Sequence, residues 1–165
     1  MATQPQGKTV SASRVTLSQM MQPEYANYHG NVHGGWIMKL VDEAGALTCM
    51  RHAQMRVVTV AVDQMVFRQP IRLGDLVTLT AEVSYVGRTS MEAEVHVVAE
   101  NPLTGTCTYT NTAYVVYVAL DDAGNPAPVP PLIAENEAER RRMEEGKERQ
   151  AYRLEQSRRM AANGR

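Results

Sequence analysis

The sequence changes its hydrophobic period once, and this change limits the folds that the chain can adopt. From Trp36 to His52, apolar residues recur at intervals of three and four without a proline, which is typical of an amphipathic helix. Between about residues 58 and 118, apolar and polar residues alternate at every second position instead, in four long segments typical of strands. Turn-forming residues separate these segments: Pro70 and Gly74-Asp75, then Gly87-Arg88, then Asn101-Pro102 with Gly105.

One helix and four strands with one apolar face each bury their apolar surface most simply when the sheet curls around the helix. Short connections between successive strands imply antiparallel neighbours. The sequence thus predicts an α+β fold of the hotdog type, a single domain over residues 13–133 with an antiparallel sheet wrapped around a long central helix. Val15, Leu17 and Met20 predict a short first strand that ends near Pro23. One helix covers one face of the sheet, so the other face is expected to be polar or to meet a partner.

The two ends of the chain differ from this domain in composition. Residues 1–12 are polar and small, which predicts a flexible N-terminal arm. The stretch 121–131, rich in Pro, Asp and Gly, is expected to close the domain. Residues 134–165 are dense in Arg and Glu with few apolar positions, so we expect a charged and mostly solvated helical tail.

Composition excludes several function classes. A length of 165 residues suits one domain, and a formal net charge of −1 gives no basic field for nucleic acid or a membrane surface. Cys49 and Cys107 lack CxxC spacing and the four histidines lack an HExxH pattern, so we expect reduced thiols and no metal. No apolar run approaches the roughly 20 residues of a membrane span, and the first residues lack the apolar core of a secretory signal. A cytoplasmic location is expected by elimination.

The start of the predicted helix offers a place for negative charge. Gly34 and Gly35 lie where backbone N–H groups lack intrahelical partners and the helix dipole is positive. Glycine also allows a substrate to approach closely, so the Gly35 N–H is a candidate oxyanion donor. A plain tight turn would have the same sequence.

Asp42 lies inside the helix, two turns beyond Gly35. It is a candidate general base or nucleophile if it points into a cleft, and an ordinary surface residue if it faces solvent. Asn27 and Asn31 precede the helix, and either could hold a water or polarise a carbonyl, although loop asparagines also serve turns and caps.

The segment Gly87-Arg88-Thr89-Ser90 offers a cation and two hydroxyls at the start of a strand. Arg88, Thr89 and Ser90 are therefore candidates for binding phosphate, although an ordinary hairpin turn would look similar.

Read in order, several motifs closely resemble the cytosolic acyl-CoA thioesterase family, including the brain-type acyl-CoA hydrolases. The motifs are ANYHGNVHGGWIMKLVDEAG, VVTVAVDQMVFRQPIRLGD, VGRTSMEAEVHV and NTAYVVYVALDDAGNPAPVPPL, and the likeness covers about residues 15–133. The resemblance implies hydrolysis of acyl-CoA without a cofactor other than the CoA of the substrate. It also implies a catalytic pair at Asn27 and Asp42, whereas Asn31 matches a nearby loop position. Asp42 would activate water or attack directly to give an anhydride, and Asn27 would position water and substrate.

Brain-type members carry two hotdog repeats, whereas this sequence has one. Because the family's site lies between two hotdogs, the resemblance implies a homodimer with two equivalent sites, and further a trimer of dimers. By position, Arg88, Thr89 and Ser90 would contact the CoA phosphates or pantetheine. Two alternatives stay open: a hydratase or dehydratase of enoyl or hydroxyacyl thioesters, which would need a pair such as His33 with Asp42, and a binding module without catalysis.

Overall fold

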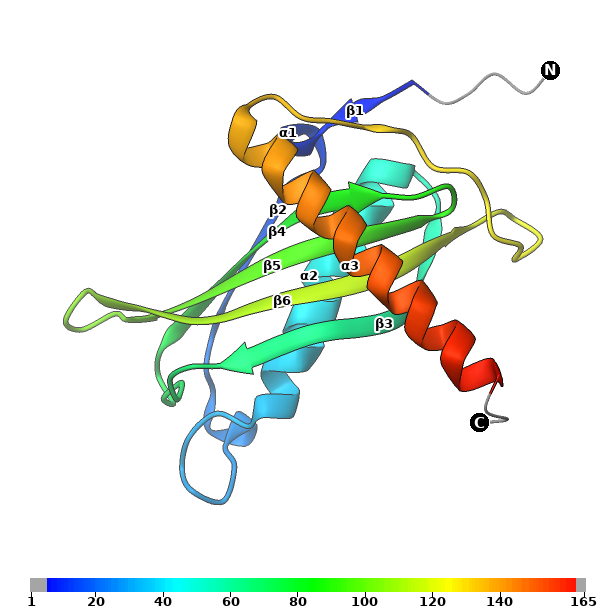
Figure 1. The fold of residues 1–165 in the computed structure, drawn as a ribbon. Helices are drawn as coiled ribbons and strands as arrows, with labels where there is room; N and C mark the ends of the chain where they lie inside the picture. The colour runs from blue at the N-terminus through cyan, green and yellow to red at the C-terminus, as the bar shows by residue number, and fades with distance from the viewer. Residues whose placement is uncertain (1–5, 163–165) are drawn as a thin grey trace.

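A five-stranded antiparallel sheet with a long helix against one face forms the body of the chain. The computed structural model describes residues 6–162. The strand order is β2 (Val15–Met20), β4 (Leu76–Val86), β5 (Ser90–Asn101), β6 (Thr106–Leu120) and β3 (Arg56–Phe67). Helix α2 (Gly34–Ala53) lies behind this sheet in Figure 1. The α+β fold of the hotdog type that the sequence predicts is confirmed.

Helix α2 follows the predicted period and is slightly longer than expected. His33 caps its N-terminus, and Gln54, in the left-handed conformation with φ of 55°, ends it. The helix buries an apolar stripe against alternate residues of the sheet, which is why a period of 3.6 and a period of 2 meet in one core. On the helix and on the two central strands β4 and β5, the core residues include Ile37, Leu40, Val41, Ala44, Val77, Leu79, Ala81, Val83, Met91, Ala93, Val95 and Val97.

Strand β3 departs from the sequence prediction in two ways. It pairs with β6, the last long strand, and not with β4, which follows it in sequence, so it forms one edge of the sheet. Two register shifts interrupt its pairing, and Val58, Val60 and Val62 are 43%, 54% and 50% exposed. These valines were expected to form an apolar face toward the helix, but bulges break the alternation. The result is an apolar edge strand that is unusual for an isolated chain.

The N-terminal segment is attached to the domain, at least from residue 8. Strand β1 (Lys8–Thr9) pairs in parallel with β7 (Leu132–Ile133), and α1 (Val10–Ser13) follows it. Val10 is 2% exposed and belongs to the core. The flexible arm expected over residues 1–12 is therefore replaced by paired and packed structure at residues 8–12, and residues 1–5 lie outside the described part.

The C-terminal helix covers the second face of the sheet. A 3-10 turn, η1 (Pro23–Tyr25), precedes the helix α2, and α3 (Glu137–Ala162) crosses the sheet on the side opposite to α2 (Figure 1). Arg149 donates two hydrogen bonds to the Glu92 carboxylate, at 2.8 and 3.1 Å, and Arg142 bonds Glu82 at 2.7 Å. Glu92 is 1% exposed. Most of the helix is exposed, as expected for the tail, and ion pairs with buried carboxylates fix one side of it to the sheet.

His52 gives the fold a dependence on pH. It is fully buried, and its Nε2 lies 2.9 Å from the carbonyl oxygen of Pro130. No residue of the described range 6–162 bonds its Nδ1. Burial lowers the pKa of His52, the positive charge of Lys8 adds to this, and the bond to Pro130 acts in the opposite direction. The folded pKa therefore lies below the unfolded value of about 6.5, so the stabilisation is fully present above that pH and is lost as the pH falls below it.

We expect the thermal midpoint to drop between pH 7.5 and pH 5, by about 2–4 °C for each kcal/mol lost. His52→Gln should show a smaller drop, because glutamine takes up no proton in this range. His29→Gln, which changes an exposed histidine, should keep the drop of the wild type. Equal slopes for all three proteins in calorimetry would contradict the role of His52.

Candidate functional site

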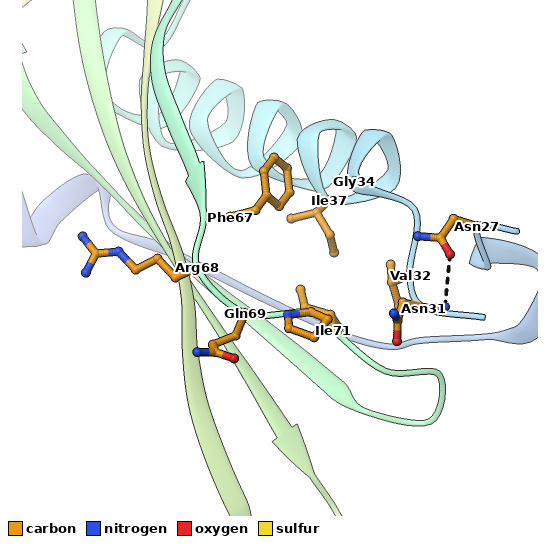
Figure 2. Close-up of a pocket in the computed structure, with 10 residues that line it drawn as sticks. Asn27, Asn31, Val32, Gly34, Ile37, Phe67, Arg68, Gln69 and Ile71 are labelled. Carbon is orange, nitrogen blue, oxygen red and sulfur yellow. Dashed lines mark hydrogen bonds between the residues drawn. The ribbon is translucent and has the colours of Figure 1, made fainter. Parts of the chain in front are cut away.

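A cavity of about 260 Å³ lies at the N-terminal end of α2. Asn27 and Asn31 line it from the preceding loop, Gly34 and Ile37 line it from the helix, and residues 67–71 at the end of β3 form the opposite wall. Figure 2 shows the two asparagines together at one end and the apolar side chains across from them. The cavity is thus mainly apolar with amide groups at one side, which suits an extended ligand with a polar group.

Asn27 holds the loop and still has a free donor. Its Oδ1 accepts hydrogen bonds from the backbone N–H groups of His29 at 2.9 Å and Asn31 at 3.2 Å, so it stabilises the turn. Within residues 6–162 its Nδ2 forms no hydrogen bond. The Asn27 side chain therefore stabilises the turn through its oxygen, and its amide N–H group remains able to donate to a ligand in the cavity.

The N–H of Gly35 is already engaged. It donates to Nδ1 of His33 at 2.9 Å, which is the cap of α2. Gly34, and not Gly35, lines the cavity that contains Asn27. Gly35 can bind an oxyanion only if the His33 ring turns away, because an N–H group has a single proton to donate. Within residues 6–162 no hydrogen bond joins His33 to Asp42, and the Nδ1 of His33 is occupied by the cap.

Asp42 is half-buried and held by hydroxyl groups from two strands. Thr59 Oγ1 donates to Asp42 Oδ1 at 2.7 Å. The Tyr117 hydroxyl shares its single proton between the same oxygen, at 3.1 Å, and the Asp42 backbone carbonyl, at 2.9 Å. Its neighbour Glu43 instead pairs with Lys39 on the exposed side of the helix. Asp42 is therefore not an ordinary surface aspartate, and the two adjacent acids have different roles.

The turn with Arg88, Thr89 and Ser90 lies beside α3. The Ser90 hydroxyl accepts a hydrogen bond from Gln150 Nε2 at 3.2 Å, and the Thr89 carbonyl accepts from the Ala119 N–H. Arg88 is exposed and lines a hollow of about 340 Å³ between this turn, residues 128–132 and α3. Arg88 also has a structural contact, because its carbonyl accepts from the Val129 N–H, but its side chain is exposed and open to a ligand.

One chain does not bring these candidates together. From Gly34 to Asp42 the helix advances about 12 Å, at 1.5 Å per residue. Arg88 comes just after the C-terminal end of β4, whereas the cavity that Asn27 lines is formed in part by residues 67–71, which precede the N-terminal end of β4. A strand of 11 residues spans about 36 Å, so Arg88 and this cavity lie at opposite ends of β4. The asparagine and the aspartate therefore lie apart within one chain.

The sequence pattern did not identify Thr59 and Tyr117 as functional residues. Both lie in strands whose alternation predicts structure and not chemistry, and they meet because Thr59 on β3 is the direct cross-strand partner of Tyr117 on β6. A hydroxyl placed at an inward-facing strand position is the signal that could have drawn attention to Tyr117.

Comparison with known proteins gives a consistent family. The model of the thioesterase superfamily matches residues 29–106. The cytosolic acyl coenzyme A thioester hydrolase of Rattus norvegicus is 37% identical over 147 residues, which cover 88% of this chain. The chain spans 39% of the length of that rat protein.

Solved structures agree with the sequence match. The acyl-CoA hydrolase of Staphylococcus aureus, in complex with butyryl coenzyme A and coenzyme A, is 31% identical, with a TM-score of 0.84 and coverage of 96% of this chain and 99% of that one. Structures of the same protein with alanine in place of an aspartate, a threonine or an asparagine are also similar. An apo hexameric acyl-CoA thioesterase is 35% identical, with a TM-score of 0.88 over 93% of this chain and 98% of that one. Motifs, fold and relatives together show that the chain belongs to the acyl-CoA thioester hydrolases of the thioesterase superfamily.

Proposed function

We propose that this protein hydrolyses fatty acyl-CoA to free fatty acid and CoA, at a site shared by two copies of the chain. The observation that carries the proposal is the Asp42 carboxylate, which is half-buried and oriented by Thr59 and Tyr117. A carboxylate fixed in this way is suited to act as a base. The relatives support the substrate, since those named above are thioester hydrolases of acyl-CoA.

In the proposed reaction Asp42 takes a proton from water while the water oxygen bonds to the thioester carbonyl carbon. The carbonyl electrons move onto its oxygen, where N–H donors at the start of α2 of the facing copy stabilise the charge. The C–S bond then breaks, the sulfur of CoA leaves with the bonding electrons, and the proton passes to it to give the free thiol. Asn27 of the facing copy would orient the carbonyl and the water. Direct attack by Asp42, followed by hydrolysis of the anhydride, gives the same products.

Assembly of two copies follows from the separation of Asn27 and Asp42 and from the exposed edge of β3. A second chain could cover the exposed valines of β3 and bring its own asparagine to this chain's aspartate. We propose a homodimer with two equivalent sites, and three such dimers in a hexamer. The similar thioesterase that is hexameric supports this assembly. Light scattering that finds an active monomer would contradict it.

Other residues complete the proposed site. Arg88 is proposed to contact a phosphate of CoA, with Thr89 and Ser90 nearby, and Gly35 is proposed as an oxyanion donor once the His33 ring has turned away. The sequence predicts that the reaction needs no metal and no cofactor, and this stays a prediction.

The location of the protein also remains a prediction. No helix within residues 6–162 is long and apolar enough to cross a membrane. The cytoplasmic location is supported by the rat relative, which is named cytosolic.

The direct test is release of free thiol from a panel of acyl-CoA substrates of increasing chain length. We expect turnover on at least part of the panel. Hydration of enoyl-CoA without thiol release would indicate the hydratase reaction instead, and tight binding without either reaction would indicate a binding module. The panel also measures chain-length preference, which depends on the depth of the cleft between copies.

Mixing two inactive variants tests the shared site. Asn27→Ala and Asp42→Ala should each lose nearly all activity alone, because each removes one half of every site. After unfolding and refolding together, random pairing of the chains should restore about a quarter of the wild-type sites, since half the dimers are mixed and each mixed dimer has one intact site. Thiol release is the measurement, and mixtures of each variant with itself are the controls. No recovery in a mixture that has formed dimers would place both residues in one chain.

A further inference from the structure

We propose that Tyr117 is a positioning residue for the Asp42 carboxylate, and that Gly45 is a glycine because the Tyr117 hydroxyl occupies the space beside it. This inference rests on the proposed function and deepens it. It assigns a role to the largest side chain that is fully buried in the core.

Tyr117 and Thr59 hold the carboxylate from neighbouring strands. They are direct cross-strand partners, and the register of β3 shifts immediately after Thr59, where Val60 has no partner on β6. A bulge of this kind re-aims the side chains next to it, and bulges are frequent beside active sites. The pairing of the two strands therefore brings both hydroxyls to the same side of α2, where Asp42 lies.

The two donors leave one carboxylate oxygen free. Thr59 and Tyr117 both donate to Oδ1, at 2.7 and 3.1 Å, and no residue of the described chain donates to Oδ2. Both bonds to one oxygen fix the rotation of the carboxylate. Oδ2 is thereby the oxygen that faces the reacting water, and a change that lets the group rotate would lose this orientation.

Gly45 makes the contact sterically feasible. It lies one turn beyond Asp42 on the same face of α2, and a Cβ there would overlap the Tyr117 hydroxyl oxygen and lie 3.0 Å from the ring. Glycine within a helix costs about 1 kcal/mol relative to alanine, so its presence in the buried centre of α2 needs a reason. The tyrosine ring supplies that reason.

The Tyr117 hydroxyl stays protonated throughout the range in which an enzyme works. Burial raises the pKa of Tyr117 far above its usual range, and the negative charge of Asp42 raises it further. The group is therefore a donor to the carboxylate and does not act as a base or nucleophile itself.

The test compares two tyrosines on the same strand. Tyr117→Phe removes only the hydroxyl that bonds Asp42. Tyr114→Phe is the matched control, because the Tyr114 hydroxyl bonds Glu94 at 3.0 Å on the opposite face of the sheet. We expect Tyr117→Phe to lower kcat about tenfold to a hundredfold, the size expected for a lost hydrogen bond to a charged group, with KM nearly unchanged. Tyr114→Phe should match the wild type in both quantities.

A double-mutant cycle separates positioning from general stability. In an Asp42→Ala background, Tyr117→Phe should cause little further loss of the residual rate, because the group that it positions is gone. An additive loss, or wild-type kcat in Tyr117→Phe, would overturn the inference while leaving the proposed function intact. A wild-type protein that releases no thiol overturns both. Gly45→Ala, which crowds the same hydroxyl, gives a second route and should lower kcat even if the thermal midpoint is maintained.

Discussion

Asp42→Asn should lower kcat for thiol release by about 10²–10⁴-fold, the usual contribution of general base catalysis. The carboxamide has almost the same shape and still presents an oxygen to Thr59 and Tyr117, so the fold should be retained. It cannot accept a proton from water at neutral pH, and it is a poor nucleophile. The measurement is the steady-state rate with the best substrate of the panel, together with the thermal midpoint as a check on folding.

The matched control for this change is Glu43→Gln. Glu43 is the next residue on the helix, but it pairs with Lys39 on the exposed side. The same chemical change there should leave kcat within about twofold, since exposed ion pairs contribute little. If Asp42→Asn retained full activity, or if both variants lost activity equally, Asp42 would not be the base.

Glu92→Ala should lower the free energy of unfolding by about 3–5 kcal/mol, the typical result of removing one partner from a buried ion pair. Glu92 is fully enclosed, accepts from Arg149 and from the Ser84 hydroxyl, and lies 3.7 Å from Arg153. Without it, Arg149 loses its carboxylate partner, whereas Arg153 keeps its ion pair with Asp63. We expect the C-terminal part of the helix to detach, which limited proteolysis would show together with urea denaturation.

Glu144→Ala provides the comparison on the same helix. Its carboxylate pairs with Lys147 at 3.6 Å at the surface, and both side chains are well exposed. The loss there should be about 0–1 kcal/mol. Similar losses for the two variants would mean that α3 is held by apolar contacts such as those of Met143 and not by its ion pairs.

Much of the fold could be predicted because local periodicity is strong where one face is buried. The period of 3.6 in α2 and the period of 2 in β4 and β5 are each enforced by a single core, and so the sequence shows them directly. The pairing of β3 with β6 was not visible, because it depends on how the sheet closes and not on any local pattern. The bulges of β3 also hid its orientation, since each extra residue reverses which side chains point inward.

The site was only partly predictable. Asn27 and Asp42 were selected by their resemblance to a family, and neither the loop asparagine nor the helical aspartate is distinctive by itself. Thr59 and Tyr117 become relevant only once strand pairing places them opposite each other, 58 residues apart in sequence. Likewise, the arginines of α3 could not be matched to their carboxylates, because Glu82 and Glu92 look like ordinary polar positions of alternating strands.

The acidic outer face of the sheet has a consequence for how the protein is made. Translation completes all five strands by Leu120, so Glu82, Glu92 and Glu94 are in place before α3 leaves the ribosome. Before the arginines of α3 are synthesised, water can hydrate these carboxylates. The unfinished chain then presents a charged surface, whereas an apolar surface would attract other nascent chains. A sheet face that is closed by a charged helix thus exposes carboxylates, and not an apolar surface, until that helix is complete.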